Sequence, residues 1–180
     1  AAGFNPYSVT VDPTGKFAYV ANATSDSISA YSINATTGVL TQIVCSGGVT
    51  ICEGNNFIAG DSPVSVTIDS AGKYAYVVNS ISADVSAFAI DATTGALTSV
   101  GAAVVTGGTN PRSITITPSA KFAYVANDGS ASVSAFSIDT ASGTLTRIDA
   151  LPAGGGIENF PAGANPTSVS IDPSGKYAYV

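Results

Sequence analysis

The chain has 180 residues, a formal charge of −6 and 10% charged residues. Its 45% hydrophobic content is too high for a disordered chain, and no apolar run reaches the roughly 18 residues that a membrane-spanning helix needs. The four lysines lie far apart, so no basic run is available for nucleic acid. Histidine is absent, which removes the commonest general base and a common metal ligand. We therefore expect no membrane span, no nucleic-acid partner, no metal and no cofactor.

A pattern of about 38 residues recurs along the chain. Three copies align without a gap and a fourth one begins, with bounds at residues 6–43, 63–100, 111–148 and 166–180. Spacers of unequal length separate the copies, at residues 44–62, 101–110 and 149–165. The whole chain is therefore predicted to be a single segment built of equivalent units.

Within the first copy every local signal is that of a β-strand or a tight turn. Residues 8–11 alternate polar and β-branched side chains, which is the period of two of a pleated strand. In residues 12–16, proline stands where a hairpin needs a φ near −65° and glycine where it needs a positive φ. Strands follow at residues 17–21 and 27–33, and Gly38 turns the chain into a fourth strand. Each complete copy is therefore predicted to form a four-stranded antiparallel meander.

A four-stranded meander repeated at this spacing is typical of a β-propeller blade. The predicted fold class is all-β, with three full blades and half a blade of a propeller. The copies contain Tyr19-Val-Ala-Asn22, Tyr76-Val-Val-Asn79 and Tyr124-Val-Ala-Asn127, preceded by motifs of the Pro-x-Ser-Val and Asp-Pro-x-Gly-Lys type. These motifs resemble the YVTN family of β-propeller repeats, and in particular its lactonase-type branch, which includes 6-phosphogluconolactonase. The resemblance implies a ring of about seven blades.

Three and a half blades are too few for such a ring. An open segment would expose a strand edge with unpaired backbone groups, and the first six residues contain neither an initiator methionine nor a signal-peptide pattern. We therefore expect the chain to be part of a longer protein. Closure between two copies is the alternative, although it would leave two incomplete blades.

Two cysteines, Cys45 and Cys52, lie in a Gly-rich spacer with six residues between them. A disulfide between them would stabilise the loop by about 2.5 kcal/mol on the chain-entropy estimate. The alternative is a pair of buried free thiols. Because disulfides persist in oxidising compartments, the predicted bridge indicates an extracytoplasmic protein, whether secreted, periplasmic or on the cell surface.

In a propeller, the turn between the second and third strands and the spacers lie on one face, called here the spacer-loop face. Loops that vary over a repeated scaffold are common binding sites. The candidate binding residues on this face are Asn22, Asn79, Asn127, Glu53, Arg112, Glu158 and Asn159. The alternative interpretation is that the asparagines satisfy backbone groups at strand ends and that the charged side chains are merely solvated.

The leading functional hypothesis is an extracytoplasmic propeller module with a structural or interaction role. Its partner would be a protein or a carbohydrate on the spacer-loop face, or the remaining blades of the same protein. A lactonase-type hydrolase is the second hypothesis, and it needs a base to activate water and a positive group at the carbonyl. Arg112 is suitably placed for the second role, whereas Arg147 falls on an outer strand. No catalytic residue can be assigned, so the active site would lie mainly outside this segment.

Three smaller features carry their own expectations. Asp12, Asp69 and Asp172 each begin a hairpin turn, and we expect them to cap the turn rather than bind calcium. Two sequons, at Asn22 and Asn34, are candidate acceptors for a glycan if the source has the machinery, and chance occurrence is the alternative.

Ala120 stands where the other hairpins have glycine. If the turn geometry is the same, Ala120 must adopt a positive φ.

Overall fold

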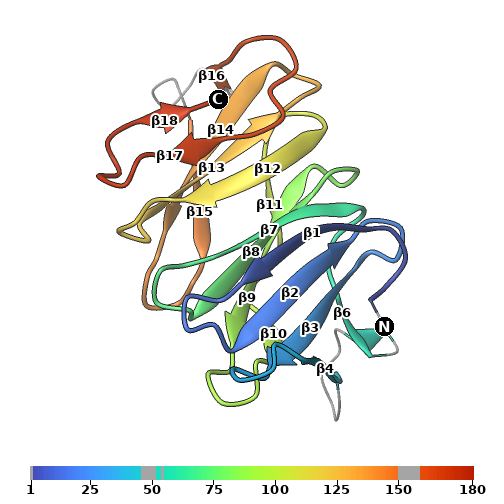
Figure 1. Ribbon diagram of the computed structural model, residues 1–180. Coiled ribbons are helices and arrows are strands. Elements are labelled where there is room, and N and C mark those ends of the chain that lie inside the picture. The colour runs from blue at the N-terminus through green and yellow to red at the C-terminus, as the bar shows by residue number, and fades with distance from the viewer. Residues whose placement is uncertain (1, 46–51, 54, 150–158) are drawn as a thin grey trace.

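Every regular element in the described part of the chain is a β-strand. The computed structural model describes residues 2–45, 52–53, 55–149 and 159–180, and within them it contains no helix, hence none that could cross a membrane. Three antiparallel sheets follow the three complete sequence copies, and a two-stranded hairpin follows the fourth. The sheets succeed one another in chain order from the N-terminal to the C-terminal end (Figure 1). This arrangement confirms the predicted all-β propeller segment.

The strands have nearly the predicted bounds. The first blade consists of β1 (Pro6–Val11), β2 (Phe17–Asn22), β3 (Ser27–Ile33) and β4 (Leu40–Ile43). The second consists of β7 (Pro63–Ile68), β8 (Tyr74–Asn79), β9 (Asp84–Ile90) and β10 (Leu97–Ser99). The third consists of β12 (Pro111–Ile116), β13 (Phe122–Asn127), β14 (Ser132–Ile138) and β15 (Leu145–Ile148). The terminal hairpin has only two short strands, β17 (Ser170–Ile171) and β18 (Ala178–Tyr179).

The spacers are not simple loops between blades. Their strands are β5 (Cys52–Glu53), β6 (Asn56–Ile58), β11 (Val104–Val105) and β16 (Phe160–Pro161). β6 pairs with β3 at Ser27 and Ile28, whereas β4 pairs with β3 at residues 30–33. The third strand of a blade is longer than the fourth, so the spacer returns to pair the backbone groups that the fourth strand leaves open. The outer edge of each blade is therefore made of two pieces, the fourth strand and a short spacer strand. The stretch of variable length that joins these two pieces is called here the excursion of the blade.

The first strand of every complete blade begins with a β-bulge. In β12 the pairs Pro111 to Asn127 and Ser113 to Ala126 leave Arg112 as the extra residue. Tyr7 and Val64 are the extra residues of β1 and β7. A bulge bends the strand and redirects its side chain. The first strands also lie beside one another along the inner side of the blades (Figure 1).

The hydrophobic core lies in the two seams between successive blades. In the first seam Phe17, Tyr19 and Ile28 of blade one pack against Val77 and Phe88 of blade two. The second seam repeats this arrangement with Tyr76 and Val85 against Val125 and Phe136. Each blade thus buries its apolar faces against its neighbours.

The tyrosine and the asparagine of the repeated Tyr-Val-x-Asn motif have different structural roles. The Tyr19 hydroxyl donates to the carbonyl of Gly95 at 2.9 Å, and the Tyr76 hydroxyl donates to that of Gly143 at 3.0 Å. Both glycines lie in the turn between the third and fourth strands of the next blade, with φ of 72° and 78°. A Cβ on Gly95 would collide with the ring of Phe17. The tyrosine therefore joins two blades, whereas the asparagine acts within one blade.

Candidate binding face

The three repeated asparagines are fully buried, with 0% exposure. Their side-chain amides donate to a serine of the third strand: Asn22 to Ser29 at 2.9 Å, Asn79 to Ser86 at 2.9 Å and Asn127 to Ser134 at 2.7 Å. Their Oδ1 atoms are buried and have no partner within the described residues. These asparagines were binding-face candidates, but the structure leaves them no surface to offer a ligand. Their partners are serine hydroxyls and, for Asn79, also the carboxylate of Asp84, rather than the backbone groups that the alternative interpretation named.

Arg112 lies at the bulge of β12, on the inner side of the third blade. Its Nε donates to Asp128 Oδ2 at 3.3 Å, and its side chain is 34% exposed. Asn110 Nδ2 donates to the same carboxylate oxygen at 2.9 Å. The Ser80 hydroxyl, from the second blade, donates to Asn110 Oδ1 at 2.9 Å. Asp128 therefore fixes the Nε side of the guanidinium, and the Nη1 and Nη2 groups have no partner among the described residues.

This charged pair occurs in one repeat only. Where the third blade has Arg112 and Asp128, the first has Tyr7 and Ala23. The second blade has Val64 and Ser80 at these positions. A structural role common to all blades would not require a charge pair in one of them. Arg112 was predicted from the sequence, whereas Asp128 and Asn110 were not, although two opposite charges in the same repeat copy are a usable signal.

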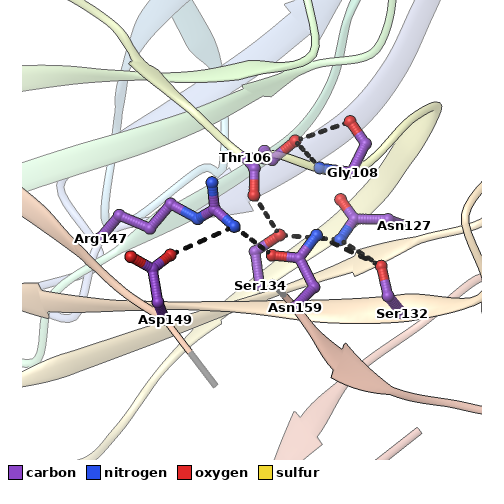
Figure 2. A network of polar contacts seen from close by, with 8 residues as sticks. All are labelled: Thr106, Gly108, Asn127, Ser132, Ser134, Arg147, Asp149 and Asn159. Atoms are coloured by element: carbon purple, nitrogen blue, oxygen red, sulfur yellow. Dashed lines mark hydrogen bonds and ion pairs between the residues drawn. The ribbon is translucent and has the colours of Figure 1, made fainter. Parts of the chain in front are cut away.

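Arg147 belongs to β15, the outer strand predicted for it, and its guanidinium points toward Asn159 and the spacer residue Thr106 (Figure 2). Its side chain is 9% exposed. Nη2 donates to Asn159 Oδ1 at 2.8 Å and lies 3.5 Å from Asp149. Nε and Nη1 are buried without a partner in the described chain. A Cβ on Gly107 would collide with this guanidinium, so the glycine makes room for it. The candidate binding residue Asn159 is thus a hydrogen-bond partner of Arg147.

Several predicted residues fall outside the described part of the structure. Glu158 is one, and the side chains of Glu53 and Cys52 are others. Cys45 is half-buried and packs against the core of the first seam. The disulfide between Cys45 and Cys52 therefore stays a prediction.

The two sequon asparagines differ in exposure. Asn22 is fully buried, whereas Asn34 is exposed and its Oδ1 accepts the amides of Thr36 and Thr37, each at 3.0 Å. Only Asn34 is accessible to a glycosyltransferase in the folded chain. Its use as a glycosylation site stays a prediction.

The hairpin aspartates cap their turns, as expected. Asp12 Oδ1 accepts the amide of Phe17 at 2.7 Å, and its Oδ2 accepts that of Thr14 at 3.0 Å. Burial would raise the pKa of Asp12, but these hydrogen bonds outweigh it and lower the pKa. In Asp172, the hydroxyl of Ser174 and three backbone amides lower the pKa to about 2. The carboxylates of Asp12 and Asp172 are therefore already occupied by groups of their own turns.

A cavity of about 500 Å³ lies on the spacer-loop face. It is lined by residues 2–4, by the turn at residues 24–27 and by Asn56. Asp26 is its charged lining residue, and the carboxylate accepts the amide of Ser62 at 2.7 Å. This cavity does not contain Arg112. The cationic side chain of Arg112 and this cavity are therefore two separate features of the described residues.

Sequence comparison matches two stretches of the chain, residues 1–52 and 50–158, to the family described as "Lactonase, 7-bladed beta-propeller". No curated protein sequence matches the chain.

Among solved structures, a candidate 6-phosphogluconolactonase of Bacteroides fragilis is 28% identical, with a TM-score of 0.73 over 93% of this chain and 42% of that one. A corresponding protein of Bacteroides uniformis is 21% identical, with a TM-score of 0.76 over 96% and 46%. A periplasmic gluconolactonase of Pseudomonas aeruginosa is 22% identical, with a TM-score of 0.66 over 89% and 43%. The chain thus spans less than half the length of these proteins.

Proposed function

Because the chain belongs to the family of seven-bladed β-propeller lactonases, we propose that it contributes three blades and a hairpin to a propeller that binds a sugar-acid lactone. The proposed site is at the inner side of the spacer-loop face, where Arg112 lies. Both Bacteroides proteins are named for 6-phosphogluconolactone and the Pseudomonas protein for gluconolactone. A lactone of this class has a carbonyl and hydroxyl groups, and its phosphorylated form adds an anion.

The pairing of Arg112 with Asp128 is the observation that carries this proposal. Asp128 holds the guanidinium through Nε alone, which leaves the two Nη groups for an oxyanion, a carboxylate or a phosphate. A donor placed where negative charge develops at a carbonyl lowers the barrier of ring opening. Arg112 is therefore proposed to bind the substrate and to stabilise the oxyanion.

Asp128 does not act as the base in this scheme. Its carboxylate already accepts hydrogen bonds from Arg112 and Asn110, and withdrawing it would release the arginine. The base that activates water is therefore proposed to come from another part of the ring. This division of roles agrees with a chain that covers less than half of its structural relatives.

A structural or interaction role is the second candidate. One observation favours it. The excursions of variable length begin at the outer edges of the blades, whereas Arg112 lies on an inner strand and is therefore separate from them. A protein or carbohydrate partner would then contact the excursions. For both candidates we propose an extracytoplasmic location, supported by the cysteine pair and by the periplasmic relative from Pseudomonas aeruginosa.

The test measures hydrolysis of 6-phosphogluconolactone and glucono-δ-lactone by the protein and by two variants. Arg112→Gln should lower kcat/KM about tenfold or more, because a charge-assisted hydrogen bond contributes about 1.5–3 kcal/mol. Lys121→Gln is the control, since Lys121 is an exposed cation of a hairpin on the opposite face. A protein that hydrolyses neither lactone would favour the interaction role. Equal activity of both variants would remove Arg112 from the site.

A further inference from the structure

We propose that the rim of the first seam contains a binding slot for a small neutral amide group, such as an acetamido group or a carboxamide side chain. A cavity of about 230 Å³ lies there, lined in part by Gly60, Ser86, Phe88, Ser99 and Ala103. A single water takes up about 30 Å³, so the slot has room for a group of several heavy atoms. It lies at the third and fourth strands, on the outer side of the blade, and is thus separate from Arg112 on the inner strand.

The slot exists because blade two has small side chains where the other blades have long ones. Ser99 pairs with Phe88, and in the same register Gln42 pairs with Tyr31 and Arg147 with Phe136. The spacer residue just before the two that pair with the third strand shows the same contrast: it is Ala103 in blade two, Asn56 in blade one and Asn159 in blade three.

The other two blades show what fits at this place. In blade one Gln42 Nε2 donates to Asn56 Oδ1 at 3.3 Å. In blade three the guanidinium of Arg147 donates to Asn159 Oδ1. Planar nitrogen-bearing groups therefore fill the equivalent volume from within the chain. In blade two a ligand can take their place.

The charges around the slot favour a neutral occupant. Arg147 has Asp149 as its counter-charge, two residues further along the chain. The residue that follows Ser99 at the same spacing is Gly101, and the lining of the slot contains no charged side chain. A guanidinium would be desolvated there without an anion, which is unfavourable. An uncharged amide does not carry this penalty.

Ser86 supplies the specific contact. The corresponding hydroxyls have acceptors, because Ser29 donates to Asn56 Oδ1 at 2.9 Å and Ser134 to the carbonyl of Thr106 at 2.8 Å. Ser86 accepts from Asn79 Nδ2 at 2.9 Å, but within the described residues its own proton has no acceptor. An amide carbonyl in the slot would accept it, with the apolar part of the ligand on Phe88 and Ala103.

The test follows amide NMR signals of Ser86 and Ser99 in the full protein during titration with three probes. Acetamide represents the bare group, N-acetylglucosamine an acetamido sugar, and N-acetylglutamine amide a protein side chain. Glucose and guanidinium are the controls without a neutral amide. Saturable shifts with at least one amide probe, and none with the controls, are expected. Equal shifts with glucose or guanidinium, or no shift with any probe, would overturn the proposal.

Two variants check the location. The double substitution Ser99→Gln and Ala103→Asn copies blade one and should abolish the shifts while the protein stays folded. Ser86→Ala should weaken binding about tenfold, as expected for one lost hydrogen bond. Asn79 keeps its bond to Asp84 at 2.7 Å in that variant, so the fold should persist. Undiminished binding by the filled double variant would place the ligand elsewhere.

Discussion

Ala120 adopts the positive φ that the alignment of the four sequence copies predicts for it. Its φ is 56°, against 71°, 68° and 73° for the glycines of the equivalent turns, Gly15, Gly72 and Gly175. This conformation is strained for a residue with a Cβ, by about 1 kcal/mol. The third hairpin therefore keeps its geometry at an energetic cost that the other hairpins avoid.

The substitution Ala120→Gly should accordingly raise the free energy of unfolding by about 0.5–1 kcal/mol. Denaturant unfolding measures it directly. Ala141→Gly is the matched control, because Ala141 is exposed in a turn without a positive φ and should lose stability on the same change. A loss at both positions would show that the third turn does not strain Ala120.

The same hairpin also lacks the aspartate cap. Thr117 Oγ1 accepts the amide of Phe122 at 3.2 Å, whereas Asp12 accepts two turn amides with two oxygens. Thr117→Asp should therefore stabilise the chain at pH 7 by about 1 kcal/mol. The gain should depend on pH, because such a cap lowers the pKa of the folded carboxyl, as in Asp12 and Asp172.

The direction of this dependence follows from linkage. A carboxyl with a lowered folded pKa stabilises fully above its unfolded pKa of about 3.9, and the effect disappears as pH falls through the folded pKa. For a cap like that of Asp172 the window extends down to about pH 2. Comparing the variant with the parent chain at pH 7 and pH 2 tests it. An equal gain at both values would contradict an ionic cap.

The tyrosines of β2 and β8 join neighbouring blades, because each donates a hydrogen bond to a backbone carbonyl of the next blade. Burial raises the pKa of the Tyr76 hydroxyl above that of free tyrosine, so this group remains a donor to Gly143 at ordinary pH. Tyr76→Phe should lower the free energy of unfolding by about 1–3 kcal/mol, because it leaves a buried carbonyl without its donor. Tyr124→Phe is the control, since Tyr124 has no such bond within the described chain. Denaturant unfolding of the two variants should therefore separate them, and equal losses would argue against a seam hydrogen bond.

The sequence predicted the strands well because their signals are local and repeated. In each copy the alternation of polar and apolar residues indicated the strands, and proline and glycine indicated the turns between them. The positive φ of Ala120 was predicted because alanine stands there in place of glycine. The two-piece outer edge was missed because Phe57, Val104 and Phe160 pair at equivalent places but lie at different distances from the fourth strand. For the candidate site, Arg112 was named from the sequence and its role stays a prediction. The burial of Asn22 and its equivalents was not predicted, because spacing alone does not show which way a strand-end side chain turns.

At the scale of the whole molecule, stability is distributed over the seams. Val9 is 66% exposed on the free side of blade one, whereas its equivalent Val66 is 4% exposed inside the first seam. Leu40 and Leu97 show the same contrast, with 53% and 1%. Each blade therefore relies on a neighbour for its core, as in other repeat proteins.

The predicted disulfide should affect one excursion rather than this distributed core. A bridge between Cys45 and Cys52 closes a short loop, and its loss should cost about 2.5 kcal/mol on the chain-entropy estimate. Hydrogen exchange before and after reduction should show faster exchange near Cys45 and unchanged protection of β8 and β13. Mass measurement of two free thiols in the unreduced protein would contradict the bridge.

Because the outer edge is made of two pieces, the register of the strands does not depend on the length of the excursion between those pieces. In blade one, Ile43 at the end of β4 pairs with Ala30 of β3, and Phe57 of β6 pairs with Ile28 of the same strand. The number of residues between Ile43 and Phe57 does not affect these pairings. The stretch between the two paired pieces comprises residues 44–56 in blade one, 100–103 in blade two and 149–159 in blade three. Its length therefore changes between blades without a register shift, which would otherwise move a whole set of side chains to the wrong face. Each blade therefore has a built-in insertion point, where new loops can arise by mutation or be grafted in the laboratory while the ring geometry is conserved.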